Sequence, residues 1–236
     1  MTREIVSVEV AGCAVPCVAH RPAEVPRGGV ICVQPFLEEA NRTRRLFNMV
    51  GTALAARGWS CLLPDLPGCG ESPHALMQVR WQTWVEALAG LIARQEPPVR
   101  LFSIRLGALV AAQAAVRVPV ERHVALAPVD RGDTHLRHWL RVRALASREI
   151  GPEVSVADLE GEIAAGRPLL LAGARVPAEL AQEIAAARWP GTDYAGAAVY
   201  RLGSGIGGID APVYWQLAEP PEPGAAALQI ADLVLA

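Results

Sequence analysis

The stretch Leu101–Ala112, LFSIRLGALVAA, predicts a strand that passes through a sharp turn into a helix. In a nucleophile elbow of the G-x-S-x-G type, such a turn exposes a serine between small residues. Ser103, Gly107 and Ala108 supply the small residues here, but the central position is Arg105. A guanidinium stays protonated and has no lone pair with which to attack a carbonyl carbon. The stretch therefore predicts the frame of an elbow without its nucleophile.

The base of a catalytic triad is missing as well. Triad chemistry needs a nucleophile, a base that takes its proton and a group that orients the base. In enzymes with this elbow the histidine comes late in the chain. No histidine follows His138, and the late stretch VYWQLAE offers Gln216 and Glu219 instead. The sequence therefore argues against Ser-His-Asp catalysis.

Arg105 needs a partner, because burying an unpaired charge costs several kcal/mol. Three acids in neighbouring loops are candidates: Glu38, Glu39 and Asp130. We favour an internal ion pair that fills a former active site. The alternative is a clamp for an anionic ligand, since the planar fork of a guanidinium suits a carboxylate or a phosphate and a helix N-terminus favours anions.

Other polar residues of the same loops are candidate contacts for a ligand: Gln34, Asp130, Arg131 and Cys69. A carboxylate at Glu38 or Glu39 would repel an oxyanion, but either residue is a candidate general base for another chemistry.

Cys69 stands between two glycines, with His74 five residues later. The two side chains form a candidate nucleophile and base, but no third group is evident. A small residue in a tight turn is the better interpretation of Cys69.

Arg44 and Arg45 open a predicted helix, where cations oppose the helix dipole. This position predicts an acidic partner, such as Glu39, for at least one of them.

His135 and His138 are spaced i, i+3 beside Asp133. That spacing can place two metal ligands on one face of a helix. A third ligand is not evident, so polar residues on a basic helix are the better interpretation. We predict no metal site and no cofactor.

Four short apolar runs predict buried strands, at residues 28–35, 60–65, 99–104 and 122–129. The patterns between them predict helices at residues 41–58, 81–95 and 106–117. Strands and helices that alternate with short links are typical of a parallel, doubly wound sheet. The carboxyl ends of such strands form the ligand-binding crevice. This edge gathers the loops at 34–42, 65–75, 103–107 and 128–134.

Both ends of the chain depart from this alternation. Residues 4–20 predict an antiparallel hairpin at the edge of the sheet. Beyond Val129 the pattern predicts helices at 133–148, with Asp133 as N-cap, and at PAELAQEIAAAR, late strands near 197–202 and 212–217, and a final helix at 224–235. We predict a core of residues 1–130 and 196–236, with residues 131–195 as a cap over the carboxyl ends of the strands.

Composition excludes several classes of function. The 236 residues are 52% hydrophobic and carry a net charge of −2, which argues against nucleic acid as a partner. The absence of lysine excludes Schiff-base chemistry. Five cysteines without a C-x-x-C pair indicate a reducing compartment. No apolar run is long enough for a membrane span or a signal peptide, so we expect a cytoplasmic protein.

Three stretches, in this order, resemble the α/β-hydrolase fold. VQPFLEEANRTRR stands where that fold has its oxyanion loop, LPDLPGCGES matches the pattern D-x-x-G-x-G-x-S, and Ser103–Gly107 aligns with the elbow. The resemblance implies a doubly wound, mostly parallel sheet with a helical cap. Only about nine residues separate the two late strands, too few for a crossover helix, so we expect a shortened C-terminal half.

QPFLEEANRTRR, DLPGCGES, IRLGALVA, APVDRG and APVYWQLAEPPE further resemble the second of the hydrolase-like families associated with the exosortase A system of bacteria. The resemblance spans nearly the whole chain and implies a link to exopolysaccharide and protein-sorting gene clusters. That family tends to have Arg-Leu-Gly at the elbow, as here. Its usual His-Pro-Phe is replaced by Gln34-Pro35-Phe36, which removes one more candidate base.

Three hypotheses for the function follow. The first is a hydrolase-like protein without triad catalysis that serves as a binding or assembly component of an exosortase or exopolysaccharide system, with a protein partner. The second is an unorthodox hydrolase or acyltransferase in which Arg105 binds an anion and Glu38 or Glu39 is the base. The third is a plain binding protein for a small anion or an acyl group.

Overall fold

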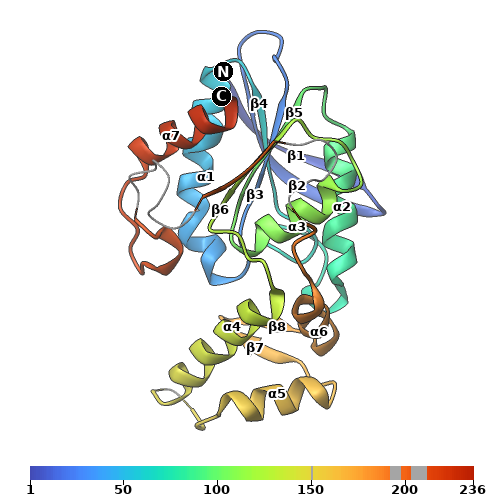
Figure 1. Ribbon diagram of the computed structural model, residues 1–236, viewed down its shortest axis with the longest axis vertical. Coiled ribbons are helices and arrows are strands. Elements are labelled where there is room, and N and C mark those ends of the chain that lie inside the picture. The colour runs from blue at the N-terminus through green and yellow to red at the C-terminus, as the bar shows by residue number, and fades with distance from the viewer. Residues whose placement is uncertain (150, 192–197, 203–211) are drawn as a thin grey trace.

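A seven-stranded sheet forms the centre of the molecule in the computed structural model (Figure 1). The structure describes residues 1–149, 151–191, 198–202 and 212–236, the side chains of residues 198–202 excepted. The strands follow the order β1-β2-β4-β3-β5-β6-β9. Their bounds are Thr2–Val10 (β1), Cys13–Arg21 (β2), Gly29–Val33 (β3), Ser60–Pro64 (β4), Val99–Ile104 (β5), Arg122–Leu126 (β6) and Ala198–Leu202 (β9).

The sheet is mostly parallel, as the alternation of strands and helices predicts. β4, β3, β5, β6 and β9 run parallel, whereas β1 and β2 form an antiparallel hairpin whose second strand pairs antiparallel with β4. Every residue of β3 is buried, which explains its continuous apolar run: helices cover both faces of a central parallel strand. The hairpin predicted at residues 4–20 is confirmed, with β1 at the edge of the sheet.

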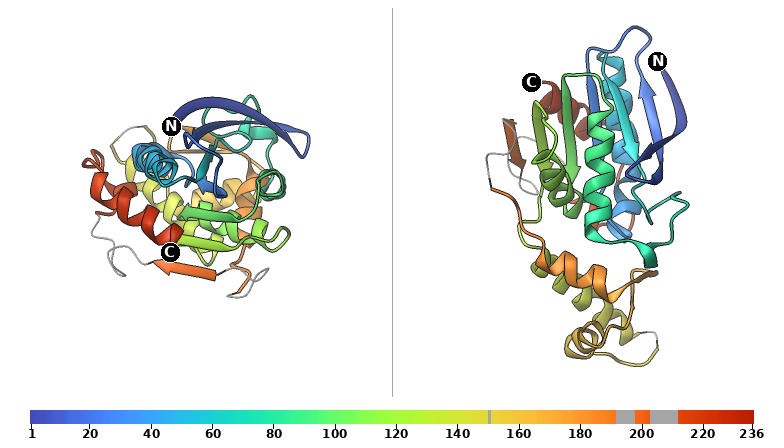
Figure 2. Two further views of the ribbon diagram at one scale, coloured as in Figure 1. Left: turned by 90° about the horizontal axis from the view of Figure 1, so that it is seen from above. Right: turned by 90° about the vertical axis from the view of Figure 1, so that its right-hand side faces the viewer.

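Helices cover both faces of the sheet (Figure 2). α1 (Glu38–Ala56) and α7 (Gly224–Leu235) pack together over one face, and α2 (Trp81–Ala93) and α3 (Leu106–Ala115) over the other. Each pair encloses its own hydrophobic core against the sheet. The final helix, α7, has the predicted bounds. α1 begins three residues earlier than predicted, which brings Glu38 and Glu39 into its first turn instead of a loop.

Beyond β6 the chain forms α4 (Gly132–Ser147), α5 (Val156–Ala164), the short strands β7 (Leu169–Leu171) and β8 (Ala174–Val176), and α6 (Ala178–Ala186). Figures 1 and 2 show these elements gathered at one end of the sheet, and we call residues 132–186 the cap segment. The division at residues 131 and 195 into core and cap stays a prediction. α5 was not predicted, although Ser155 and Asp158 form the capping box that marks its start.

Two predictions beyond β6 are wrong. Asp133 is not an N-cap but lies in the first turn of α4, whose N-cap is Arg131. The predicted strand at 212–217 is a 3-10 turn, η2 (Tyr214–Gln216), in which Tyr214 and Trp215 are buried against α1. The aromatic side chains that favour a strand are buried by this turn instead, so tertiary packing overrides local propensity. Without that strand, no crossover helix is needed after β9. A second 3-10 turn, η1 (Leu76–Gln78), precedes α2.

Candidate functional site

The turn between β5 and α3 has the backbone of a nucleophile elbow. Arg105 has φ 55° and ψ −126°, a conformation that non-glycine residues rarely adopt and that costs about 1–3 kcal/mol. Its N–H donates to the Leu126 carbonyl at 3.1 Å, and its own carbonyl accepts from the Ala108 N–H at 3.1 Å. Gly107 has to be glycine, because a Cβ there would lie 2.2 Å from the Gln34 carbonyl oxygen. The first turn of α3 therefore passes directly over the end of β3.

The turn after β3 repeats this conformation. Leu37, the N-cap of α1, has φ 56° and ψ −134°. The helix that follows begins with two acids, which the dipole of its N-terminus favours. Glu38 is exposed and pairs with Arg42 at 3.2 Å, whereas Glu39 is buried. Successive residues of a helix point about 100° apart, so the starting residue of α1 decides which acid faces inward.

Glu39 is the acid that the structure pairs with Arg105. The Arg105 Nε donates to Glu39 Oε1 at 3.1 Å, and the two side chains are 22% and 10% exposed. Burial raises the pKa of the Glu39 carboxyl, and the adjacent Arg105 guanidinium offsets part of that rise. Asp130, the third predicted partner, lies exposed at the surface after β6. The geometry thus selects one of the three acids that the sequence left open.

His135 of α4 completes this arrangement. The Arg105 Nη2 lies 3.3 Å from His135 Nδ1, and because a guanidinium only donates, Nδ1 is the acceptor. The proton of the neutral imidazole is then on Nε2, which lies 3.8 Å from Glu39 Oε2. Burial lowers the pKa of His135 to about 3, and the positive charge of Arg105 adds to this effect. We call Arg105, Glu39 and His135 the elbow cluster.

The sequence did not identify His135 as a neighbour of Arg105. Its spacing from His138 directed attention to a metal pair, but among the described residues no group of three or more His, Cys, Asp or Glu side chains is arranged to hold a metal ion. The signal that could have identified His135 is its position in the chain. It lies four residues after Arg131, in the first turn of α4, where the loop after β6 meets the elbow. His138, by contrast, is exposed.

Asp130 and Arg131, two predicted binding residues, lie at the protein surface rather than in the elbow cluster. Arg131 pairs with Asp133 at 2.7 Å, and Asp133 also lies 3.1 Å from Arg188. The hydrogen bond from Arg131 lowers the pKa of the Asp133 carboxyl. These charges join the start of α4 to the segment after α6.

Cys69 is not an activated nucleophile. Its thiol donates to the Pro67 carbonyl at 3.9 Å, and burial raises its pKa to about 12, with a smaller contribution from the charge of Asp65. A thiol with that pKa has almost no thiolate at neutral pH. The geometry therefore favours the interpretation of Cys69 as a small residue in a turn.

A hydrogen-bonded serine and histidine lie inside the sheet, a pair that sequence reasoning missed. Ser103 Oγ of β5 and His123 Nε2 of β6 are 2.5 Å apart, and both residues are 0% exposed. Burial lowers the pKa of His123 to about 3. In the parallel register of β5 and β6, Leu101 lies beside His123. Ser103 follows Leu101 by two residues and therefore points to the same face of the sheet as His123. A substrate cannot reach this pair, which satisfies polar atoms within the core.

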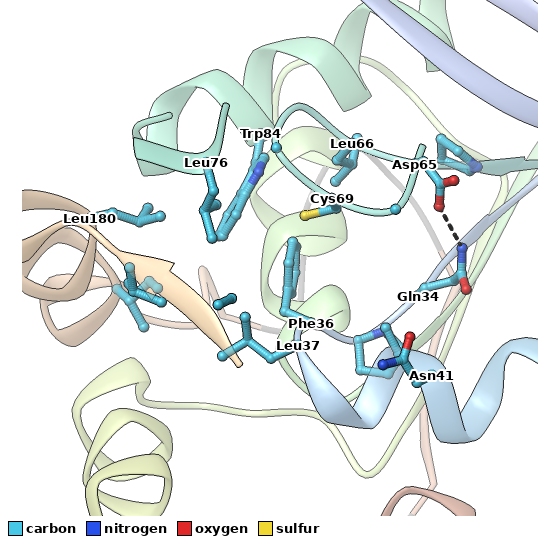
Figure 3. Close-up of a pocket in the computed structure, with 18 of the residues that line it drawn as sticks. Gln34, Phe36, Leu37, Asn41, Asp65, Leu66, Cys69, Leu76, Trp84 and Leu180 are labelled. Carbon is cyan, nitrogen blue, oxygen red and sulfur yellow. Dashed lines mark hydrogen bonds between the residues drawn. The ribbon is translucent and has the colours of Figure 1, made fainter. Parts of the chain in front are cut away.

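A pocket of about 170 Å³ lies between the loops after β3 and β4 and the cap segment. Figure 3 shows its apolar side chains, which include Phe36, Leu66, Leu76, Trp84 and Leu180. The rings of Phe36 and Trp84 stack with their centroids 4.1 Å apart. Gln34 and Cys69, two predicted binding residues, line this pocket, whereas the elbow cluster does not.

Polar side chains gather at one end of the pocket, as Figure 3 shows for Gln34 and Asp65. The Gln34 Nε2 donates to Asp65 Oδ1 at 3.5 Å, and Arg44 lies 3.6 Å from the same oxygen. The Glu71 N–H donates to the other carboxylate oxygen at 3.0 Å. Arg44 thus has an acidic partner, as predicted, but it is Asp65 rather than Glu39, and Arg45 pairs with Glu222.

A larger groove of about 600 Å³ runs between the start of α1, the cap segment and η2. It shares Leu37 and Trp139 with the pocket, and Glu39 lines it. Arg143, half-buried in this groove, forms no ion pair within the described part of the chain. The groove therefore combines apolar walls with an available positive charge.

The arrangement of sheet and helices is that of an α/β-hydrolase fold. Est1E from Butyrivibrio proteoclasticus, solved with ferulic acid bound, is similar over 98% of this chain and 99% of its own, with a TM-score of 0.64 and 11% identity. The epoxide hydrolase VrEH1 from Vigna radiata is 22% identical over 53% of this chain and 38% of its own, with a TM-score of 0.43. No family model and no curated protein matches the sequence.

Proposed function

We propose, on the premise of an α/β-hydrolase fold, that this chain binds a small ligand and does not perform Ser-His-Asp catalysis. The observation that carries the proposal is the Arg105 guanidinium at the elbow, held by Glu39 and His135. A guanidinium does not attack a carbonyl. His135 uses Nδ1 to accept from Arg105, and its pKa of about 3 makes it a poor base at neutral pH. The elbow keeps its shape, while the Arg105 charge is paired with the Glu39 carboxylate.

The remaining candidate nucleophiles do not replace Arg105. Ser103 is enclosed in the sheet, and the Cys69 thiol stays protonated because its pKa is about 12. Space for a ligand lies beside the elbow, in the pocket and in the groove. The apolar walls and the half-buried Arg143 of the groove fit an acyl group or a small organic anion. Arg105 itself is a weaker candidate for an anion clamp, because a carboxylate already neutralises it.

The setting we propose is a cytoplasmic component of an exosortase or exopolysaccharide system, with a protein partner. The resemblance of five stretches of the sequence to a family linked to those systems supports it. All five cysteines are free thiols, which is typical of a reducing compartment. Within the described residues no helix has both the length and the apolar character needed to cross a membrane. Affinity purification of the tagged full chain from its own cells, followed by mass spectrometry, tests the partner: enrichment of exosortase-system proteins supports it, and their absence contradicts it.

A panel of short- and long-chain p-nitrophenyl esters and acyl thioesters tests the absence of catalysis. We expect the purified chain to hydrolyse them no faster than its Arg105→Ala variant. The proposal fails if the unaltered chain turns over an ester or thioester and the Arg105→Ala or Glu39→Ala variant does not.

The same panel tests a second candidate, an unorthodox hydrolase or acyltransferase in which Glu39 activates water and Arg105 binds the substrate anion. One observation favours it: Glu39 Oε2 is buried beside the groove and has no hydrogen-bond partner among the described side chains. Burial also raises the pKa of Glu39, which improves it as a base. Activity lost in Glu39→Gln and retained in Glu38→Gln, the exposed neighbour, would support this candidate over the first.

A further inference from the structure

The first strand of the sheet, β1, has a long outer edge to which no other described strand pairs. β1 lies at the end of the strand order and has nine residues, whereas the inner strands β3 and β4 have five each. Figure 2 shows β1 at the outside of the molecule. An open edge of this length presents a row of backbone donors and acceptors, which is a template for pairing with another chain.

The turn between β1 and β2 decides which residues of β1 use the outer edge. Ala11 and Gly12 have φ angles of 49° and 73°, which are typical of a type I′ hairpin turn. In such a turn the Val10 carbonyl accepts from the Cys13 N–H, so these two residues form a hydrogen-bonded pair. Hydrogen-bonded and other pairs alternate along an antiparallel ladder. The even-numbered residues of β1 therefore bond to β2, and the odd-numbered residues direct their N–H and C=O groups to the outer edge.

The other side of β2 agrees with this assignment. The Asp65 N–H donates to the Pro16 carbonyl at 2.8 Å, so the even-numbered residues of β2 bond toward β4 and its odd-numbered residues bond toward β1. The register pairs these odd-numbered residues with the even-numbered residues of β1. Four residues of β1 then have both backbone groups at the open edge: Arg3, Ile5, Ser7 and Glu9.

The side chains of these four residues share one face of β1, and that face is exposed. Ile5 is 80% exposed, whereas Val6 and Val8 point to the opposite face and pack against the core. Arg3 and Glu9 form no ion pair within the described chain. They lie three residues before and three residues after Val6, so the strand carries opposite charges at equal distances from its centre.

We infer that β1 is a dimerisation edge, at which a second copy of this chain pairs antiparallel about a two-fold axis at Val6. In this register Arg3 lies opposite Glu9 of the second copy and Ile5 lies opposite Ser7, so every outward backbone group is bonded and both charges are paired. A shift of two residues in either direction removes one hydrogen-bonded pair and separates the opposite charges. Two-fold pairing uses the open edge of both copies and therefore closes at a dimer.

The dimer goes beyond the proposed function and does not depend on it. None of the four outward residues lines the pocket or the groove. Both sites stay accessible when the two sheets join. Ester or thioester turnover would overturn the proposed function and leave the dimer intact.

Sedimentation velocity of the purified full chain, tagged at its C-terminal end, tests the pairing between about 1 µM and about 100 µM. One strand from each copy covers less surface than the interface of about 1,200–2,000 Å² of a stable complex, so we expect a reversible dimer within this range. Arg3→Glu sets like charges opposite each other on both sides of the axis, and we expect the dissociation constant to rise about tenfold or more. Arg3→Glu with Glu9→Arg restores opposite charges and returns the constant to within about threefold of the unaltered chain. Arg141→Glu is the matched control, because it makes the same change of charge at an exposed position of α4 and leaves the constant unchanged.

A second pair of measurements tests the backbone bonds. Ser7→Pro removes an outward N–H and leaves the bonds to β2 in place, since proline is tolerated at the outer edge of a sheet, and we expect a monomer throughout the range. Hydrogen exchange of the amides of residues 3–9 should slow as the concentration of the unaltered chain rises.

Three results would overturn the inference. The first is a monomer at every concentration, which is also the result expected if a different protein covers this edge. The second is a dimer that Arg3→Glu weakens no more than Arg141→Glu does. The third is a dimer in which exchange at residues 3–9 stays fast, since the interface would then lie elsewhere. If the Ser7→Pro chain does not fold, the exchange of charges between Arg3 and Glu9 still decides the question.

Discussion

The elbow cluster and the pocket lie at the same edge of the sheet, but side chains fill the first region and leave a space in the second. In the elbow cluster, Arg105 bonds both Glu39 and the neutral imidazole of His135, and these side chains fill the space at the elbow. In the pocket, apolar side chains leave a space, and one acceptor, Gln34 Oε1, faces no donor among the described residues. Residues 34–41 contribute to both. The comparison teaches that the strained backbone of an elbow can carry an arginine in place of a nucleophile, while a pocket lies beside it.

The largest effect that would sharpen this contrast comes from breaking the ion pair. Glu39→Ala leaves the mostly buried Arg105 without its counter-ion, and we expect it to lower the free energy of unfolding by about 3 kcal/mol. Glu38→Ala removes a neighbouring carboxylate that is 49% exposed, and we expect a loss of about 0.5 kcal/mol or less. Urea denaturation followed by circular dichroism measures both.

A double variant distinguishes the stability that is lost with the ion pair from the stability that is lost because the start of α1 is disrupted. Arg105→Ala with Glu39→Ala leaves neither charge unpaired, so its loss should be smaller than the sum of the two single losses. Additive losses, or equal losses in Glu38→Ala and Glu39→Ala, would contradict the closed cluster.

A smaller effect is the response of the elbow cluster to acid. The folded state holds the pKa of His135 near 3, below its ordinary 6.5, so the native protein binds fewer protons than the unfolded chain between these values. Stability from this group is complete above the ordinary pKa and is lost as the pH falls toward 3, by about 1.4 kcal/mol per pH unit. Glu39 acts with the opposite sign, because its pKa is raised and its protonation favours the folded state.

His135→Gln keeps an acceptor for Arg105 but removes the titrating imidazole. Between about pH 6 and pH 4 we expect the variant to lose about 2 kcal/mol less stability than the unaltered protein. His138→Gln is the control: His138 is exposed, so its removal changes the pH dependence less. Urea titrations at a series of pH values measure this, and identical slopes for the unaltered protein and His135→Gln would show that His135 is not buried in its neutral form.

Most of the fold could be predicted from the sequence because the central strands are buried on both faces and therefore read as unbroken apolar runs. β3, with every residue buried, is the clearest case. Prediction failed where packing outweighs local pattern. Tyr214 and Trp215 favour a strand by propensity, yet they bury their rings against α1 from a 3-10 turn. The start of α5 was missed although its capping box was present in the sequence.

The elbow could be located from the sequence, but its neighbours could not be selected. Glu38 and Glu39 differ by one position, and only the starting residue of α1 decides that Glu39 faces Arg105. His135 lies 30 residues from Arg105 in the sequence and belongs to a different helix. The contact between Arg105 and His135 depends on how the cap segment packs against the core, which a local sequence pattern does not predict. The sequence did place Gln34 among the candidate binding residues, because the strand end before it was clear.

The smallest expected effect concerns stability at the other side of the comparison, where the amide oxygen of Gln34 is buried without a hydrogen-bond partner among the described residues. Gln34→Leu replaces an amide whose oxygen has no hydrogen-bond partner in the described structure and whose nitrogen makes only a long bond of 3.5 Å to Asp65. Replacing an unsatisfied polar group by an apolar one of similar shape is close to neutral, so we expect the free energy of unfolding, without ligand, to change by less than about 1 kcal/mol. Urea denaturation measures the change. A loss of more than about 2 kcal/mol would mean that Gln34 supports the fold as Glu39 does. The polar residues of the two regions would then both serve the stability of the fold.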